Sequence, residues 1–466
     1  MQNLIKDIRF NLYEVLNSEK LLNTERYKEH NIEIFDAVID TAKKIAEDLF
    51  APHNTKADEH EPSFDGENVK LIPETKKAWD AFAKAGFLAT SMDEEWGGSQ
   101  LPEVIARAVY LIFCAANVST SVYPFLTIGV AELIHSFASQ EQKELYLPAL
   151  LDGRFSGTMA LTEPDQGSAL ADITTTAKLQ ADGSYLLKGQ KIFISAGDHE
   201  LSENIIHMVL AKIEGAPAGV KGISLFICPK FLLNDDGSLG KRNDLALTGL
   251  LHKMGYRNAS STLLSFGDND NCKAYLIGKA HKGLGYMFLM MNGARIGVGT
   301  GAAAVGYAGY SYSLNYAHER KQGRLPSNRD PSSPQLAIIK HADVRRMLLA
   351  QKSYVEGSIA ICLYATSLLD IQKTGTLTEK KNALALLEFL TPVVKSWPSK
   401  YGPKANDLAI QILAGAGYMR DHPVEQYYRD NRLNAIHEGT RGIQAIDLLG
   451  RKLTYNKFEY YQAFKD

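Results

Sequence analysis

The spacing of apolar residues changes twice along the chain and divides it into three regions. Over residues 10–155, apolar side chains recur three and four positions apart, which is typical of helices packed against a core. The same spacing returns over residues 286–453, where a polar loop at 323–334 interrupts it. Between the two helical regions, short apolar runs are separated by turn residues, which indicates a β domain.

The β region consists of short strands joined by tight turns. The sequence Ala-Asp-Gly-Ser at 181–184 lies between two apolar runs and is a strong hairpin signal. Because no helical stretch separates successive runs, we expect an antiparallel sheet and not a parallel sheet with crossover helices. The predicted strands are 174–179, 185–194, 205–213, 223–229, 262–266 and 274–277.

The predicted fold class is α+β. We place an N-terminal helical domain at 1–157, a middle antiparallel β domain at 158–285 and a C-terminal helical bundle at 286–466. The chain has 466 residues, of which 45% are hydrophobic, so it can bury a large core in several domains.

Composition excludes several classes of protein. The formal net charge of −2 gives no electrostatic case for a nucleic-acid partner. The four cysteines form no Cys-x-x-Cys pair, so we expect no metal site and no disulfide framework. We see neither a secretory signal nor an apolar segment that approaches membrane-spanning length, and we expect a protein of the reducing cytoplasm.

One acidic residue stands in an unusual setting. Glu438 lies between an apolar approach and a glycine, in the stretch Ala-Ile-His-Glu-Gly-Thr-Arg-Gly-Ile-Gln at 435–444. Glycine permits backbone angles that other residues resist, and Thr440 can cap a helix that begins after it. An acid near a helix start also favours the positive end of the helix dipole. The stretch fits a simple helix cap or a catalytic base, and the rest of the chain must decide.

Two clusters near the start of the β region carry groups that suit a planar cofactor. Thr162 and Ser168 lie in the loop Thr-Glu-Pro-Asp-Gln-Gly-Ser, whose hydroxyls and amides can bond a ring edge or a ligand carbonyl. Phe193 and Ser195 lie on one predicted strand, where the ring can stack on a cofactor and the hydroxyl can bond a ring atom. Ordinary turns and core packing use the same residue types, so neither cluster is specific alone.

Two further clusters lie in the C-terminal helical region. Arg320, in His-Glu-Arg-Lys-Gln-Gly-Arg, closes a predicted helix, where a cation complements the helix dipole, but its guanidinium fork also suits a pyrophosphate. Gln411 precedes Gly415 and Gly417 in Gln-Ile-Leu-Ala-Gly-Ala-Gly-Tyr. One glycine explains a helix end, whereas two close together let the backbone approach another group.

The segment Gly-Val-Gly-Thr-Gly-Ala at 297–302 matches the dinucleotide-binding fingerprint as text. That fingerprint requires a strand before the glycines, and a helical run stands there instead. We therefore expect small residues that let helices pack closely, and no nicotinamide site.

Taken together, these clusters resemble the acyl-CoA dehydrogenase family, flavoproteins built from a helical, a β and a second helical domain. The resemblance spans nearly the whole chain and implies FAD as the cofactor. It assigns Glu438 as the catalytic base. Residues implied to bind the cofactor are Thr162, Phe193, Ser195, Arg320 (from a neighbouring subunit), Gln411, Gly415 and Thr440. Residues implied to bind the substrate are Ser168, Arg295, His437 and Gly439.

A narrower resemblance is to the branch of this family that includes 3-methylmercaptopropionyl-CoA dehydrogenases. It is carried by the segments 189–197, 344–349 and 447–452. Members of that branch usually continue well beyond the last segment, so this chain is expected to be a fragment or a shortened form.

The resemblance implies that an acyl-CoA thioester loses its α-proton to Glu438 and its β-hydride to flavin N5. The substrate would be 3-methylmercaptopropionyl-CoA or another short to medium acyl-CoA. Electron-transferring flavoprotein would reoxidise the flavin of a homodimer or homotetramer. Two alternatives stay open: an acyl-CoA oxidase on the same fold, and a flavin-retaining binding protein that is not a dehydrogenase. The near-neutral charge and the intact Glu438 argue against the second.

Overall fold

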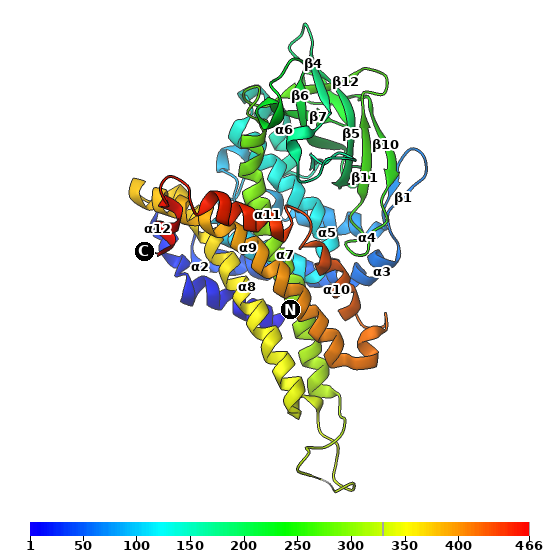
Figure 1. Cartoon of the computed structure of the whole chain (residues 1–466), viewed down its shortest axis with the longest axis vertical. Coiled ribbons are helices and arrows are strands. Elements are labelled where there is room, and N and C mark those ends of the chain that lie inside the picture. Colours follow the sequence, from blue (N-terminus) through cyan, green and yellow to red (C-terminus); the bar gives the residue numbers. More distant parts are fainter. Residues whose placement is uncertain (329, 466) are drawn as a thin grey trace.

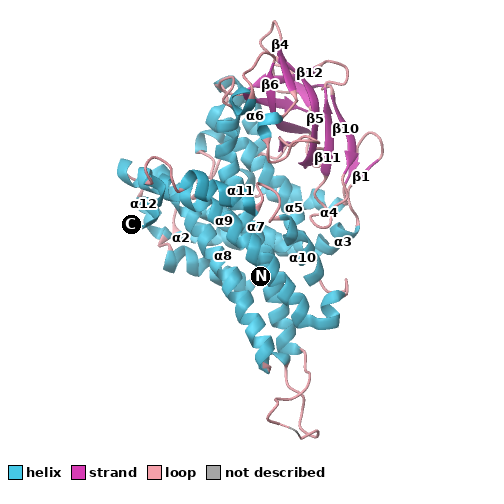
Figure 2. Cartoon of the chain, viewed as in Figure 1, coloured by secondary structure: helices cyan, strands magenta, loops and turns pink. Residues whose placement is uncertain are grey.

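The computed structural model describes residues 1–328 and 330–465, and the side chains of residues 288–291 lie outside this description. Figure 1 shows a β domain at one end of a larger helical body. The chain runs from helices through strands and back to helices (Figure 2), which confirms the predicted α+β fold class. The loop predicted at 323–334 has no helix or strand in its described part, which leaves out Arg329.

The N-terminal region is built around one long, kinked helix, α5 (Glu103–Phe137). Asn117 has φ −162° and ψ 90° and interrupts it, and its side-chain oxygen accepts a hydrogen bond from the Thr120 amide at 3.0 Å. The two arms face each other, so the rings of Tyr110 and Phe125 stack with centroids 4.8 Å apart. The other elements are α1 (Gln2–Arg9), α2 (Ile32–Ile45), α3 (Asn54–Glu59), α4 (Pro73–Lys84), α6 (Gln140–Leu151) and the short strands β1 (Ser63–Phe64) and β2 (Val69–Lys70).

The strands of the middle region are β3 (Phe155–Ala160), β4 (Thr176–Leu179), β5 (Tyr185–Ser195), β6 (Asn204–Ile213), β7 (Ile223–Pro229), β8 (Phe231–Leu233), β9 (Leu239–Arg242), β10 (Leu245–Leu250), β11 (Ser261–Phe266) and β12 (Cys272–Leu276). Eight of them form one sheet in the order β10-β11-β5-β12-β7-β6-β3, with β4 paired to β5 and β6. The prediction of a purely antiparallel sheet is wrong at β6, which runs parallel to both β3 and β4. An intervening pair of strands, β4 and β5, returns the chain so that β3 and β6 share a direction.

Three long helices form the C-terminal bundle and approach one another through glycines. A Cβ atom at Gly299 would lie 2.2 Å from the Val394 oxygen, and one at Gly306 would lie 3.1 Å from the Gly402 Cα. The segment 297–302 therefore serves helix packing, as predicted. The helices are α7 (Gly283–Glu319), α8 (Ala342–Thr374), α9 (Leu377–Leu413), α10 (Val424–Leu433), α11 (Arg441–Ile446) and α12 (Glu459–Lys465).

Two apolar cores join the three regions. The first contains side chains of the N-terminal helices together with those of α7, α8 and α9, for example Phe113 and Val355. The second lies between α5, α6 and the sheet, and it includes Leu150, Ile206 and Met287. Because α5 and α7 contribute to both cores, the two helical regions and the sheet meet along these two helices.

Among the described residues, two helices, α5 and α8, are long and apolar enough to cross a membrane, with mean hydropathies of 1.5 and 1.3. The expectation that no segment reaches this length was wrong. In their most apolar windows, 78% of α5 and 50% of α8 is buried inside the structure. Core helices of a folded domain have the same composition, because they are apolar on several faces.

Candidate active site

The predicted base lies in the short loop between α10 and α11. Glu438 has φ +52° and Gly439 has φ +84°, so two successive residues occupy the left-handed region. For a glutamate this conformation costs about 1–2 kcal/mol relative to ordinary backbone. Thr440 then returns to extended backbone, and its Oγ1 accepts a hydrogen bond from the Ile443 amide at 3.4 Å. The predicted helix cap is therefore confirmed, and the loop before it is strained.

Two side chains hold this loop in place. Lys395 of α9 donates from Nζ to the Gly439 carbonyl at 2.7 Å. Gln444 of α11 donates from Nε2 to the Glu438 carbonyl at 2.9 Å. A Cβ atom at Gly439 would lie only 2.7 Å from the Gln444 nitrogen, so only glycine fits between them. Both holding groups were missed by the sequence-based interpretation.

The carboxylate of Glu438 is free to accept a proton. Among the described residues, none donates a hydrogen bond to its oxygens. Burial raises the pKa of Glu438, and the nearby charges of Arg295 and Lys395 oppose that rise. Burial also lowers the pKa of Lys395 to about 8, against the attraction of Glu438. A carboxylate with a raised pKa and unoccupied lone pairs is suited to general-base chemistry.

The structure places two of the predicted substrate residues beside this base. Arg295 of α7 is buried, and its Nη1 donates to Asp447 Oδ2 at 2.8 Å. His437 shares a hydrogen bond with Asn434 Oδ1 at 3.1 Å, and burial together with Lys395 lowers its pKa to about 3. His437 is therefore neutral at physiological pH, and the fixed charges around the base are cationic apart from Asp447.

The groups predicted for the flavin come together where β3 and β5 end. The Thr162 carbonyl accepts from the Ile192 amide at 2.9 Å, and Thr158 donates from its hydroxyl to the Ser195 carbonyl at 2.6 Å. Phe193 lies between these contacts with φ +59° and 65% of its surface exposed. An exposed phenylalanine in a left-handed position within a strand is unusual, and it leaves an aromatic face open to a planar ligand. Ser168 is exposed in the following loop.

The glutamate of the same loop, Glu163, has a different environment from Glu438. Its oxygens accept hydrogen bonds from the amides and hydroxyls of Thr174 and Thr175, at 2.6–3.0 Å. The buried Lys191 also donates to it at 2.9 Å. Burial alone raises the pKa of Glu163, but Lys191 and the threonine donors outweigh it and lower the pKa to about 2. Glu163 therefore anchors the loop, and both of its carboxylate oxygens are occupied by hydrogen-bond donors.

Three predicted cofactor residues lie far from this site within the same chain. Arg320 ends α7, and the 25 residues that separate it from Arg295 span about 37 Å of helix. Gln411 lies 16 residues beyond Lys395 on α9, or about 24 Å away. Figure 1 shows the C-terminal end of α7 at the opposite end of the molecule from the sheet. Arg320, Gln411 and Gly415 are all exposed.

A cavity lies between the two arms of α5, with Met159 of β3 and Gly293 and Ala294 of α7 in its wall. It is open to solvent. Three charged side chains line it, Glu103, Arg107 and Glu132, and Arg107 Nε is buried without a hydrogen-bond partner among the described residues. Burial raises the pKa of Glu132 to about 7. The cavity was not predicted, because its two main walls are brought together only by the kink at Asn117.

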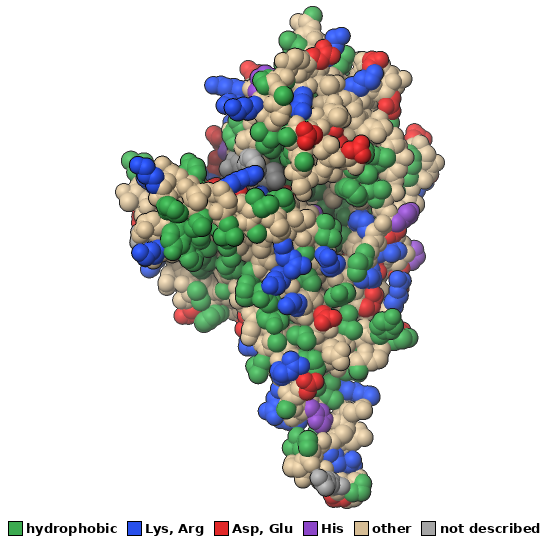
Figure 3. Space-filling model, in the orientation of Figure 1, with side chains coloured by type: hydrophobic (Ala, Val, Ile, Leu, Met, Phe, Trp, Pro, Cys, Tyr) green, Lys and Arg blue, Asp and Glu red, His purple; other side chains and the backbone are tan. Residues whose placement is uncertain are grey.

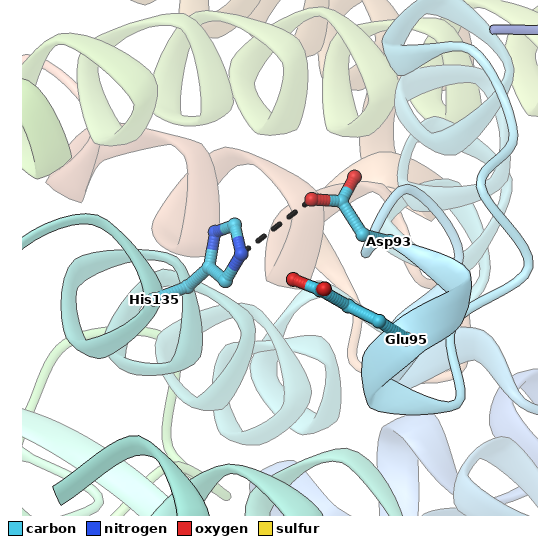
Figure 4. A group of neighbouring side chains, drawn as sticks. All are labelled: Asp93, Glu95 and His135. Atoms are coloured by element: carbon cyan, nitrogen blue, oxygen red, sulfur yellow. Dashed lines mark ion pairs between the residues drawn. The ribbon is translucent and has the colours of Figure 1, made fainter. Parts of the chain in front are cut away.

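A second group of polar side chains lies where the last turn of α5 meets the turn at residues 93–96. Asp93, Glu95 and His135 bring three donor atoms within 4.8 Å of one another (Figure 4). His135 Nε2 lies 3.5 Å from one oxygen of Asp93, and Arg26 pairs with the other. Trp96 Nε1 donates to Glu95 at 2.9 Å. Because a guanidinium already balances Asp93, these contacts account for the group without a bound cation.

Comparison with known proteins identifies the family. The chain matches the family models described as acyl-CoA dehydrogenase N-terminal domain over residues 34–154, middle domain over residues 158–269 and C-terminal domain over residues 281–453. Together these matches cover most of the chain.

Relatives and solved structures agree with the family models. The chain is 36% identical over 449 residues to 3-methylmercaptopropionyl-CoA dehydrogenase of Ruegeria pomeroyi, covering 96% of this chain and 76% of the relative. It is 36% identical over 467 residues to a butyryl-CoA dehydrogenase of Syntrophomonas wolfei, covering 98% and 76%. The crystal structure of an acyl-CoA dehydrogenase complexed with FAD from Bacillus anthracis has the same fold, with a TM-score of 0.75 at 23% identity over 93% of this chain and 70% of that one. The chain therefore belongs to the acyl-CoA dehydrogenase family and is an FAD-dependent oxidoreductase that acts on acyl-CoA thioesters.

Proposed function

We propose that this protein introduces an α,β double bond into an acyl-CoA thioester, with Glu438 as the base that removes the α-proton. The observation that carries the proposal is the Glu438 carboxylate. It has a raised pKa, no hydrogen-bond donor among the described side chains, and a strained backbone clamped by Lys395 and Gln444. The α-hydrogen of a thioester is a weak acid, so a base of raised proton affinity is better matched to it.

The residues present fit FAD. The exposed ring of Phe193 offers a stacking face, and the hydroxyls of Thr162, Ser195 and Thr440 offer donors and acceptors for a ring edge. When bound, FAD supplies the hydride acceptor, at its N5 atom. The chain's own contribution is to bind the thioester, to exclude water and to take up the α-proton at Glu438.

The remaining cofactor residues belong, in this proposal, to a second copy of the chain. Arg320, Gln411 and Gly415 are exposed. Arg320 and Gln411 lie about 37 Å and 24 Å along their helices from Arg295 and Lys395, the two residues whose charges act on Glu438. A homodimer or homotetramer brings them to a neighbour's flavin, where the Arg320 fork matches a pyrophosphate. Large apolar side chains exposed over the C-terminal helices support such a contact, and Figure 3 shows apolar groups gathered over α8 and α9. Those exposed by more than 40% include Leu349, Tyr364, Leu377, Leu384, Leu449 and Phe464.

We propose that the acyl group occupies the cavity between α5 and α7. Most of its lining side chains are apolar, as in small-ligand pockets, and α7 links it to the proposed base through Ala294 and Arg295, which are adjacent. Relatives named for 3-methylmercaptopropionyl-CoA and butyryl-CoA favour a short acyl chain for this protein. Electron-transferring flavoprotein is the proposed electron acceptor, and the four buried free thiols support a reducing, cytoplasmic setting.

The experiment is anaerobic bleaching of the flavin by a panel of acyl-CoAs. Glu438→Gln should retain FAD and bind acyl-CoA, yet bleach about 10²–10⁴-fold more slowly, which is the usual contribution of a general base. Glu29→Gln serves as the matched control, since it makes the same change at an exposed glutamate outside the site. Bleaching at the original rate in Glu438→Gln would show that another group is the base. Peroxide formation without an added acceptor would instead indicate an oxidase.

A further inference from the structure

Lys395 is a charged side chain with no surface in contact with solvent. It lies on α9 with 0% exposure, at the end of the apolar run Phe-Leu-Thr-Pro-Val-Val. Burying an ammonium is costly unless it is paired and hydrogen-bonded. The other lysine with 0% exposure, Lys191, is paired directly with the Glu163 carboxylate. Among the described residues, Lys395 has no carboxylate within ion-pair distance, and its hydrogen bond goes to the Gly439 carbonyl.

We propose that Lys395 is the positioning residue of the catalytic base. Its ammonium holds the Glu438–Gly439 backbone in the left-handed conformation, and its charge keeps the Glu438 carboxylate ionised when substrate excludes water. This inference rests on the proposed role of Glu438 and deepens it.

The backbone contact is the first step of the argument. A left-handed glutamate persists only where its surroundings over-determine it. Here two carbonyls in succession are held from two different helices, Glu438 by Gln444 and Gly439 by Lys395. Thr440 fixes the following residue as the cap of α11. The direction of the Glu438 side chain is therefore set by a clamp whose only charged member is Lys395.

The electrostatic contact is the second step. The charges that act on the base are those of Lys395 on α9 and Arg295 on α7, and the adjacent His437 is neutral. The exposed Arg441 of α11 acts on Lys395. Arg295 is partly neutralised by its ion pair with Asp447. Because the Lys395 ammonium bonds the adjacent carbonyl and not the carboxylate, it stabilises the anion without occupying its lone pairs. A direct pair would remove the basicity, as Glu163 shows with a pKa of about 2.

The test compares three substitutions of Lys395 by the pH dependence of kcat/KM. Lys395→Met removes donor and charge, so we expect activity to fall about 10²-fold, the scale of a misplaced catalytic group, and the acidic limb to move to higher pH. Lys395→Gln keeps a hydrogen-bond donor but not the charge. It should move the acidic limb of the pH profile to higher pH and lose less activity than Lys395→Met. Lys395→Arg keeps the charge and should leave the limb near its original pH.

The matched control is Lys452→Met. Lys452 is a partly buried lysine that also lies near Arg295, pairs with Glu388 and does not influence Glu438. We expect the acidic limb to stay in place in this variant. Flavin content and melting temperature, measured for every variant, separate loss of folding from loss of positioning. A merely structural lysine would lower both without moving the limb.

A readout independent of turnover completes the experiment. Infrared titration of the Glu438 carboxyl, assigned by difference from Glu438→Gln, should show a higher pKa in Lys395→Met than in the unmodified protein. An unchanged pKa together with an unchanged acidic limb would overturn the role of Lys395. Full activity in Glu438→Gln would instead overturn the proposed function, and the infrared result would still report whether Lys395 controls the carboxyl.

Discussion

Two glutamates lie beside buried lysines in this protein, one in the Thr162 loop and one before α11, and they behave in opposite ways. Glu163 accepts hydrogen bonds from two threonines and from Lys191, and its pKa falls to about 2. Glu438 accepts none from the described side chains, and burial raises its pKa. Lys395, its neighbour, bonds the backbone carbonyl one residue away.

The comparison shows how one fold gives two glutamates opposite shifts in pKa. Both lysines are buried and both have a pKa lowered to about 8, so burial and charge are matched. The difference is whether the ammonium reaches the carboxylate or the backbone. When the ammonium bonds the carboxylate, as in Glu163, it occupies the carboxylate lone pairs and fixes the loop. When it bonds the neighbouring backbone carbonyl, as beside Glu438, the carboxylate lone pairs stay available for a proton.

The largest expected effect is on stability at the anchor. Glu163→Gln leaves Lys191 buried beside a neutral amide, and breaking a buried pair in this way should lower the free energy of unfolding by about 3–5 kcal/mol. Urea unfolding followed by circular dichroism measures it. Glu438→Gln should unfold close to the unmodified protein, because it removes no hydrogen bond seen among the described residues. Equal destabilisation by the two variants would mean that the two carboxylates contribute equally to stability, which would contradict the difference in their hydrogen bonding.

The anchor should also make folding sensitive to acid. The folded pKa of Glu163, about 2, lies below its ordinary value of 4.5, so its contribution is present above pH 4.5 and is lost as the pH falls toward 2. At about 1.4 kcal/mol per pKa unit, the loss amounts to up to about 3 kcal/mol. As the pH falls from 6 to 3, the free energies of unfolding of the unmodified protein and of Glu163→Gln should approach each other. A difference in the free energy of unfolding that stays constant with pH would show that folding does not change the pKa of Glu163.

A third prediction concerns the backbone at the base. Gly439→Ala forces a Cβ atom against the Gln444 amide in a left-handed position, so stability should fall by about 1–2 kcal/mol. Displacement of Glu438 should also slow flavin bleaching by about 10²-fold. Gly442→Ala is the control, because a Cβ there meets nothing closer than 3.8 Å and lies in a helix. Similar bleaching rates in the two variants would contradict the clamp.

The smallest expected effect is at the cap of α11. Thr440→Ala removes the acceptor of the Ile443 amide and should cost about 1 kcal/mol of stability, whereas Thr440→Ser should cost little. If Thr440 also binds the cofactor, as proposed, the alanine variant should lose flavin on dilution more readily than the serine variant. Differential scanning calorimetry and flavin fluorescence measure the two effects. Equal flavin retention in both variants would remove Thr440 from the cofactor site.

Much of the fold could be predicted because its elements are locally encoded. The strand predicted at 223–229 coincides with β7, and that at 185–194 ends one residue short of β5. The parallel pairing of β6 with β3 and β4 was missed, because alternation along one strand does not state which distant strand lies beside it. The cavity was missed for a related reason, since Asn117 interrupts a helix whose apolar pattern continues on both sides.

The sequence by itself determined the helix cap at Thr440 and the candidates for the chemistry: a glutamate before a glycine at Glu438, and an aromatic strand residue at Phe193. These signals are local, because they depend on backbone preferences and side-chain type within a few positions. Only the tertiary structure decided that Lys395, 43 residues from Glu438 in sequence, meets the Gly439 carbonyl and that hydrogen-bond donors occupy both carboxylate oxygens of Glu163. The physical reason is that proton affinity depends on burial and on charges brought close by folding, and neither is written in the neighbouring residues.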